Sequence, residues 1–198
     1  MKRILAVIAA LTLASCGTTA QISGMVAVPS SQLDANSQLH SAVSLGNIVG
    51  GQGTQGLRAS EVSSFALEEA LRQSLAAQGI LAQDETRFRL DAQLEGIVHP
   101  LFGYNMTVTS TVNYTITEIA TSRVVFQQEI SESDTAALAV AFSGEDRLRI
   151  ALEGSIKANI TSFIELLRQS MENSTRAGIH GDVEPYEDLR QAVRGAVH

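Results

Sequence analysis

Strict alternation of apolar and polar side chains is the feature that most restricts the fold of this 198-residue chain. Over 87–98, apolar residues occupy every second position from Phe88 to Val98, and charged or amide residues alternate with them as far as Glu95. Further alternating runs cover 104–119 and 123–133, and turn-forming residues separate the runs. This pattern places one face of a sheet in the core and the other in water. We therefore predict a three-stranded antiparallel meander.

Two amphipathic helices are predicted to flank the meander. The first covers 60–78, where leucines recur at every fourth position, Ser60 can cap the start and Gly79 can end the helix. The second begins behind Ser143 and keeps one apolar stripe for about six turns. Together with a strand over 42–49, the meander and the two helices predict an α+β fold. Its four-stranded sheet is mainly antiparallel, and both helices pack on one face of it. The order of elements along the chain is strand, helix, strand, strand, strand, helix.

The N-terminus resembles a bacterial lipoprotein export signal. Two basic residues precede an apolar run over 4–14, which is too short for a bilayer span of about 20 residues. The sequence Leu-Ala-Ser-Cys at 13–16 resembles the lipobox, which implies that Cys16 carries a diacylglycerol after cleavage. Because Gly17 rather than an aspartate follows, the resemblance implies sorting to the outer membrane. A free thiol, an intermolecular disulfide and an ordinary secretory signal are the alternatives.

Composition divides the chain into four segments. Residues 1–15 are the predicted signal peptide, and 16–40, rich in Ser, Thr, Gln and Asn, are a predicted flexible tether. Residues 41–173 are predicted to form a single α+β domain. Residues 174–198 are a polar tail that can form a short helix near its end.

The charge of the chain restricts its partners. The formal net charge is -7 and moves to -9 when Lys2 and Arg3 leave with the signal peptide. An acidic protein lacks the general attraction that nucleic acid and anionic headgroups exert on basic surfaces. We therefore expect attachment to the membrane through lipid, and no binding to nucleic acid.

The sequence contains few residues or motifs that could form a catalytic, nucleotide-binding or metal site. The motif G-x-G-x-x-G at 51–56 resembles a dinucleotide loop, but its last glycine precedes the predicted helix and the strands that follow are antiparallel. Asp91 and Glu95 lie about 13 Å apart on one strand, beyond the roughly 5–9.5 Å of a glycosidase pair. His99 beside a turn is a candidate, with a solvated histidine as the alternative. The histidines are too scattered for a zinc site: His40, His99, His180 and His198. We predict no catalytic residue, metal or cofactor.

The polar face of the meander is the preferred candidate for partner binding. Its rows of Thr, Asn, Gln, Arg and Glu are either simply solvated or a docking surface. The candidate residues are Arg87, Arg89, Tyr104, Asn113 and Arg123. The apolar stretch 137–142 is a second candidate contact, in a loop or short helix.

The run of 65–80, FALEEALRQSLAAQGI, followed by FRLDAQL at 88–94, resembles small envelope lipoproteins. These are YajG-like lipoproteins, the lipopolysaccharide-assembly lipoprotein and activators of peptidoglycan synthases. The resemblance implies a non-enzymatic, lipid-anchored binding or assembly accessory that faces the periplasm and has an envelope protein as partner. A lipid-anchored hydrolase and a carrier of an acyl chain between helix and sheet are the alternatives.

Overall fold

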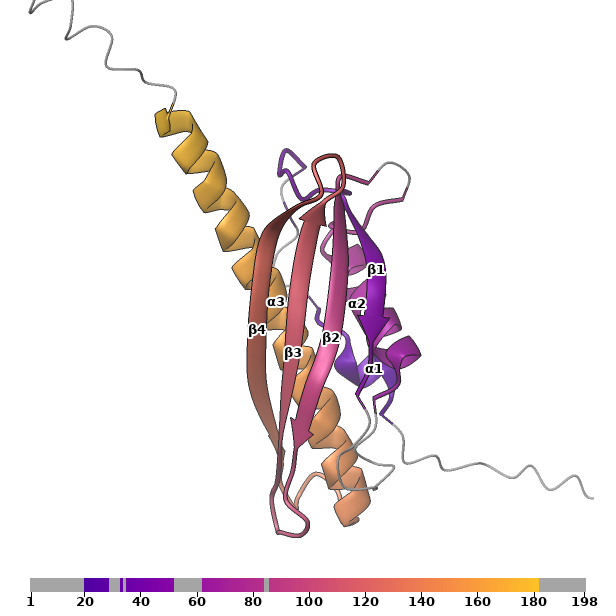
Figure 1. Cartoon of the computed structure of the whole chain (residues 1–198). Helices are drawn as coiled ribbons and strands as arrows, with labels where there is room; N and C mark the ends of the chain where they lie inside the picture. The colour runs from indigo at the N-terminus through magenta and orange to yellow at the C-terminus, as the bar shows by residue number, and fades with distance from the viewer. Residues whose placement is uncertain (1–19, 29–32, 34, 52–61, 84–85, 182–198) are drawn as a thin grey trace, which may run out of the picture.

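The computed structural model describes residues 20–28, 33, 35–51, 62–83 and 86–181, and it forms a twisted sheet with helices on one side (Figure 1). The elements, in chain order, are α1 (Ile22–Met25), β1 (Val43–Val49), α2 (Ser64–Ala77), β2 (Phe88–Val98), β3 (Met106–Glu118), β4 (Arg123–Ala136) and α3 (Gly144–Gly181). The predicted signal peptide and Cys16 lie outside the described residues.

The sheet is mixed and has the strand order β1-β2-β3-β4. The meander is confirmed, because β2 pairs antiparallel with β3 and β3 pairs antiparallel with β4. The expectation of antiparallel pairing does not hold for β1, which runs parallel to β2 with Val43 opposite Phe88. The reason is the crossover: α2 follows β1 and returns the chain to the end of the sheet where β1 began.

The predicted alternation is confirmed in β3, and in β2 as far as Leu94. Beyond Leu94 the faces exchange, so Ile97 is buried and Val98, predicted to point inward, is 72% exposed. In β3, every second residue from Met106 to Ile116 is buried, and the threonines between them face outward. In β2, the register shifts between Leu94 and Gly96, which leaves Glu95 as an extra residue in the ladder. Strand β4 departs from the prediction, since Val124, expected to point inward, is 50% exposed beside a second register shift.

The start of α3 behind Ser143 and the end of α2 before Gly79, which has a φ of 73°, are as predicted, whereas the start of α2 and the end of α3 differ. Helix α2 starts at Ser64, where the Ser63 hydroxyl accepts a hydrogen bond from the Ala66 amide at 3.1 Å. Ser60, the predicted cap, lies outside the described residues. Helix α3 extends beyond the predicted domain end at 173 as far as Gly181. It covers β3 and β4, whereas α2 covers β1. Among the described residues, no helix has the length and apolarity needed to cross a bilayer.

Part of the predicted tether belongs to the domain. Residues 22–25 form α1, a third helix on the covered side of the sheet, which contacts both α2 and α3. Met25 is fully buried, and the Ala27 amide donates to the Ser74 hydroxyl at 2.9 Å. The backbone amide of Gln21 donates to the side-chain carboxylate of Glu153 in α3 at 2.8 Å. These contacts fix residues 20–28 on the domain, so this part of the predicted tether is packed against α2 and α3.

A polar network sits inside the apolar layer between α3 and the sheet. The ring of Tyr114 stacks on Phe163, with centroids 4.2 Å apart, and its hydroxyl donates to the side-chain oxygen of Asn159 at 2.9 Å. The Asn159 amide nitrogen donates to the carbonyls of Ser110 and Ile130 at 3.0 and 2.8 Å. All polar atoms of the Asn159 amide are therefore used to dock α3 on β3 and β4.

Candidate functional site

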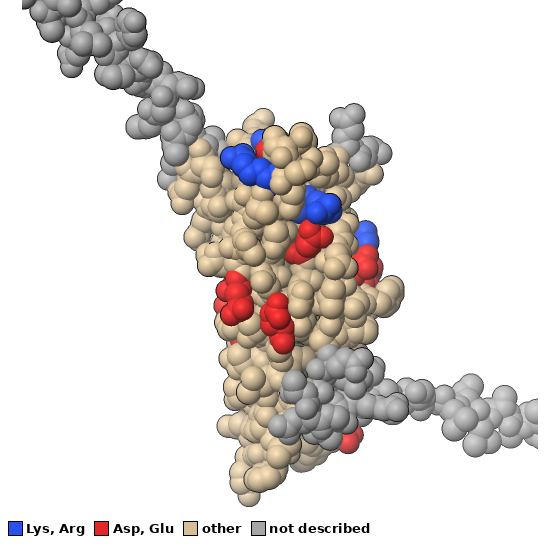
Figure 2. All heavy atoms as spheres, viewed as in Figure 1, with Lys and Arg blue, Asp and Glu red and all other residues tan. Residues whose placement is uncertain are grey.

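No described helix covers the face of β2, β3 and β4 opposite α1, α2 and α3, and we call this face the open face. Figure 2 views the molecule from this side. Hydroxyl groups pair across β3 and β4 in three successive rungs: Thr107 with Thr135 at 2.8 Å, Thr109 with Ser133 at 2.7 Å, and Thr111 with Ser131 at 2.7 Å. Hydroxyls that bond one another still have free lone pairs, so this ladder can also accept hydrogen bonds from a partner.

Two of the predicted binding residues meet at one end of the sheet. Arg87 and Arg123 lie 3.1 and 3.6 Å from the two carboxylate oxygens of Glu118. Thr121 donates to the same carboxylate at 2.8 Å. Hydrogen bonds from Thr121 and Arg87, with the charges of both arginines, hold the pKa of Glu118 below its usual value. The two arginines are therefore partnered within the domain.

The remaining predicted residues are spread over the molecule. Arg89 lies on the open face and pairs with Asp91 at 3.2 Å. Asn113 lies in the middle of the open face, opposite Gln93 and Glu129 in the ladder. Tyr104 is 82% exposed in the β2–β3 hairpin, at the end opposite Arg123. The structure thus joins Arg87 with Arg123, places Arg89 and Asn113 on the open face, and separates Tyr104 from all four.

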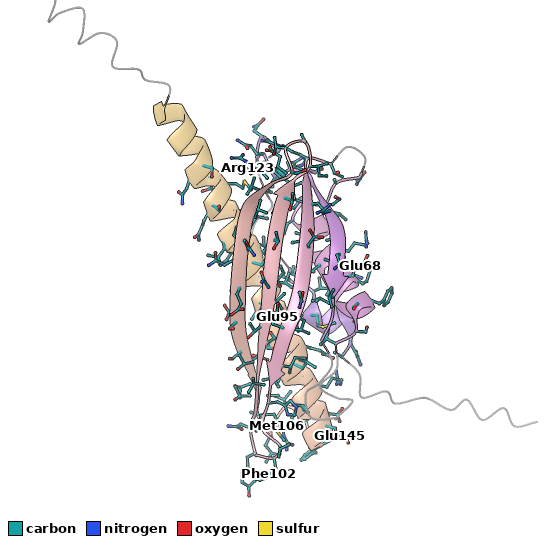
Figure 3. The ribbon with its side chains drawn as sticks, viewed as in Figure 1. Glu68, Glu95, Phe102, Met106, Arg123 and Glu145 are labelled. Atoms are coloured by element: carbon teal, nitrogen blue, oxygen red, sulfur yellow. The ribbon has the colours of Figure 1, made fainter. Side chains whose placement is uncertain are left out.

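A second surface combines Tyr104 with the apolar stretch 137–142. Figure 3 shows Phe102, Met106 and Glu145 at the same end of the molecule, far from Arg123. The β2–β3 hairpin and the β4–α3 connection meet there, and we call their exposed apolar residues the apolar tip: Val98, Leu101, Phe102, Tyr104, Leu138, Val140 and Phe142. Sequence reasoning named Tyr104 and 137–142 separately, but only the fold brings them together.

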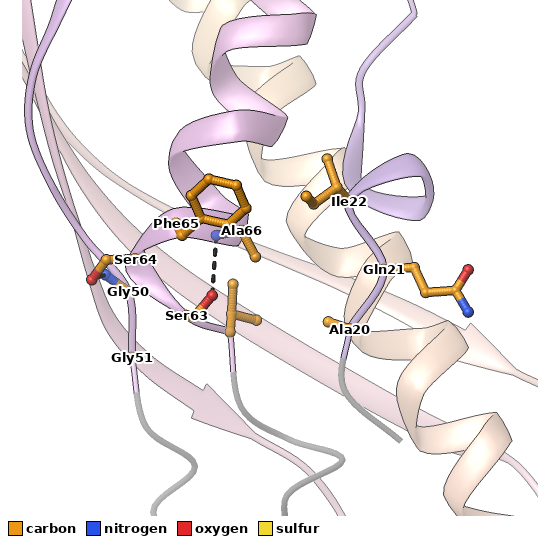
Figure 4. A pocket seen from close by; sticks show the side chains of 10 residues that line it. Ala20, Gln21, Ile22, Gly50, Gly51, Ser63, Ser64, Phe65 and Ala66 are labelled. Atoms are coloured by element: carbon orange, nitrogen blue, oxygen red, sulfur yellow. Dashed lines mark hydrogen bonds between the residues drawn. The ribbon is translucent and has the colours of Figure 1, made fainter. Parts of the chain in front are cut away.

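A cavity of about 580 Å³ opens between α1 and the start of α2 (Figure 4). Among the described residues that line it, none has a charged side chain, and the two serine hydroxyls already form hydrogen bonds. Ser63 caps α2, and Ser64 accepts a hydrogen bond from the Gly50 amide at 2.9 Å. Gly51, the first residue of the G-x-G-x-x-G motif, lies at its edge, while residues 52–56 lie outside the described residues. The described lining therefore offers no group suited to a nucleotide phosphate.

The parts of the chain that the structure describes contain no group of three His, Cys, Asp or Glu side chains that could hold a metal ion. His99, the weak catalytic candidate, has its Nδ1 atom 3.2 Å from the Pro100 carbonyl in the hairpin.

Comparison with known proteins supports the fold. No family model and no curated protein matches the chain. A crystal structure of a Xanthomonas campestris protein of the DUF330 family is similar at 11% identity and a TM-score of 0.53, over 76% of this chain and 97% of the other. A candidate lipoprotein from Caulobacter crescentus CB15 has 11% identity and a TM-score of 0.48, over 68% and 93%. A minor lipoprotein from Acinetobacter baumannii has 11% identity and a TM-score of 0.41, over 66% and 94%. At these identities the likeness concerns the fold, and resemblance to YajG-like or lipopolysaccharide-assembly lipoproteins stays a prediction.

Proposed function

We propose that this chain is a lipid-anchored, non-catalytic binding or assembly accessory of the bacterial outer membrane that faces the periplasm. The open face carries the proposal, because helices cover only the other side of the sheet. Its long strands present hydroxyl, amide and charged groups to a protein partner. The lipobox-like sequence ending at Cys16 supports the anchor, and two solved proteins of similar shape are described as lipoproteins.

The interior is less suited to the alternative role of acyl-chain carrier. A carrier would hold its ligand between helix and sheet, in a space of several hundred Å³. Here Tyr114 and Phe163 stack in that layer, and Asn159 bonds to two strands. Opening it would break these contacts and expose buried polar groups.

The anchor is tested by replacing its attachment atom. Cys16→Ser removes the thiol that would form the thioether, so the protein should leave the membrane fraction of cells. Thr18→Ala, two residues away, should fractionate as wild type does. If Cys16→Ser stayed with the membrane, the anchoring part of the proposal would be wrong.

The open face is tested by crosslinking in intact cells. A photoreactive amino acid at Arg89 or Ser131, both exposed on this face, should capture one defined envelope protein. The same group at Glu165, exposed on α3, is the matched control and should not capture it. Purification of the captured protein should in turn recover this chain. Equal capture from all three positions, or capture of abundant bystanders alone, would contradict docking on the open face.

A further inference from the structure

The apolar tip exposes more large apolar side chains than is usual for two loops that contact only water. Phe102 is 84% exposed in the hairpin, and Phe142 is 98% exposed in the β4–α3 connection. Leu101 and Val140 add to the same surface at 61% and 59% exposure. Single exposed apolar residues are ordinary on protein surfaces, but neighbouring ones on two adjoining loops mark a contact with another apolar surface.

The two chain segments that form the tip contain no formally charged side chain. No Asp, Glu, Lys or Arg occurs over 96–117 or over 135–144. In Figure 2 the tan cone at the bottom of the molecule, where the strands converge, shows neither blue nor red atoms, and red atoms lie near it only beside the grey residues. The absence of charge matters because transfer of an ionised side chain out of water is strongly unfavourable, whereas these two loops can leave water without that penalty.

Arg147 holds the two loops together. Its guanidinium donates to the carbonyls of Ala141 and Phe142, both at 2.8 Å, and to the Gly103 carbonyl at 3.3 Å. The residue is only 6% exposed, so these bonds form behind the apolar surface. Because one side chain bonds to both loops, Phe102 and Phe142 are presented as one preformed surface, which lowers the entropic cost of insertion.

The first described residue, Ala20, relates this surface to the expected anchor. Ala20 and Gly51 line the same cavity, and Gly51 lies against Leu94 of β2. From Leu94 to Val98, where the tip begins, the strand extends about 13 Å. Cys16 is four residues before Ala20, so the two are at most about 14 Å apart in any conformation. An anchored Cys16 therefore keeps the tip within reach of the membrane.

We propose that the apolar tip inserts into the lipid surface that holds the anchor, so that the domain stands on the membrane with the open face directed sideways. The inference rests on the lipidation of Cys16 in the proposed function. The exposed side of α2 would instead bring charges to the membrane, such as Glu68 and Arg72. Glu145, exposed at the start of α3, limits the depth of insertion to the tip itself.

The proposal specifies the chemistry of the lipid surface. The chain is acidic, at -7, and the tip has no basic group facing outward among its exposed residues. Insertion must then come from apolar contact, and it should occur on zwitterionic phosphatidylcholine without anionic lipid.

The absence of tryptophan from the chain allows a direct test. Phe102→Trp and Phe142→Trp each place a single tryptophan on the tip at a residue that is already exposed and aromatic. Val124→Trp, at an exposed position at the opposite end of the sheet, is the matched control. Each full-length lipidated protein is reconstituted into phosphatidylcholine vesicles, and vesicle-bound protein is isolated by flotation. We expect a blue shift of emission and quenching by brominated acyl chains at 102 and 142, and neither effect at 124.

The outcomes separate the inference from the function on which it rests. Protein that fails to float lacks the anchor, which overturns the proposed function and the tip inference together. Protein that floats but shows water-like emission at 102 and 142 overturns the tip inference alone, and would favour a protein as the occupant of the tip. Equal quenching at 102, 142 and 124 would also overturn it, because the domain would then lie flat.

Discussion

The two faces of β3 share one backbone but are held by different interactions. Toward α3, the buried Tyr114 and the carbonyl of Ser110 bond to a single asparagine of the helix. Toward solvent, Thr107, Thr109 and Thr111 bond to hydroxyls of the neighbouring strand that water could replace. A buried polar group has no substitute partner, so the inner face specifies how the helix docks. The open face is under no such constraint and can serve binding.

Removal of Asn159 should have the largest effect on stability. Asn159→Leu keeps a similar volume but deprives the Tyr114 hydroxyl and two strand carbonyls of their buried partner. We expect a loss of about 3 to 4 kcal/mol in the free energy of unfolding, measured by urea denaturation. Lys157→Leu, at an exposed site on the same helix, is the control and should change stability by less than about 0.5 kcal/mol. Equal effects from both variants would show that the buried network does not specify docking.

Tyr114→Phe should have a smaller effect, because the ring and its stack on Phe163 remain. The variant leaves the Asn159 oxygen unpaired, and we expect a loss of about 1 to 2 kcal/mol near neutral pH.

The same variant has a second, pH-dependent signature. Burial raises the pKa of Tyr114 above its usual value. Stability from a raised pKa is complete below the unfolded value of about 10 and is lost as the pH rises above it. The wild-type protein should therefore lose its advantage over Tyr114→Phe in alkaline urea titrations. An advantage that stayed constant to high pH would contradict this account.

Glu118, at the last residue of β3, should contribute a weaker dependence on acid pH. Its pKa is lowered by Thr121 and Arg87, so the associated stability is complete above the ordinary glutamate pKa of about 4.3 and is lost as the pH falls through the lowered value. Glu118→Gln should remove this dependence, so the two proteins should converge in stability under acid conditions. Thr121→Ala, which removes one donor, should reduce the dependence only in part. A wild-type advantage that grew on acidification would contradict the sign of the shift.

The sequence predicted those parts of the fold that depend on local periodicity. Alternation located β2 and β3, and the leucine and isoleucine stripe located α3. It could not predict the direction of β1, because pairing with β2 depends on the path of the crossover. It also missed the packing of 20–28, where the short apolar run 25–28, with Met25 and Ala27, lies within a segment otherwise rich in Ser, Thr, Gln and Asn.

The candidate surfaces were predicted only in part, for a related reason. Composition marked 137–142 as apolar and Tyr104 as a binding candidate, but an apolar residue in a loop is equally consistent with burial. Only the bonds from Arg147 to both loops show that they form one exposed surface. Likewise, Arg87 and Arg123 were candidates for partner binding, and only the structure shows that both lie beside Glu118.

The open face should tolerate the loss of a whole hydroxyl rung. The double variant Thr109→Val with Ser133→Ala removes both partners of the 2.7 Å pair, so no buried group is left unpaired. We expect a change of less than about 0.5 kcal/mol in the free energy of unfolding, since the pair is exposed and valine favours strands. A loss as large as that of Tyr114→Phe would show that the open face also helps to specify the fold. Unchanged stability together with weaker partner crosslinking from Ser131 would instead assign this rung to binding.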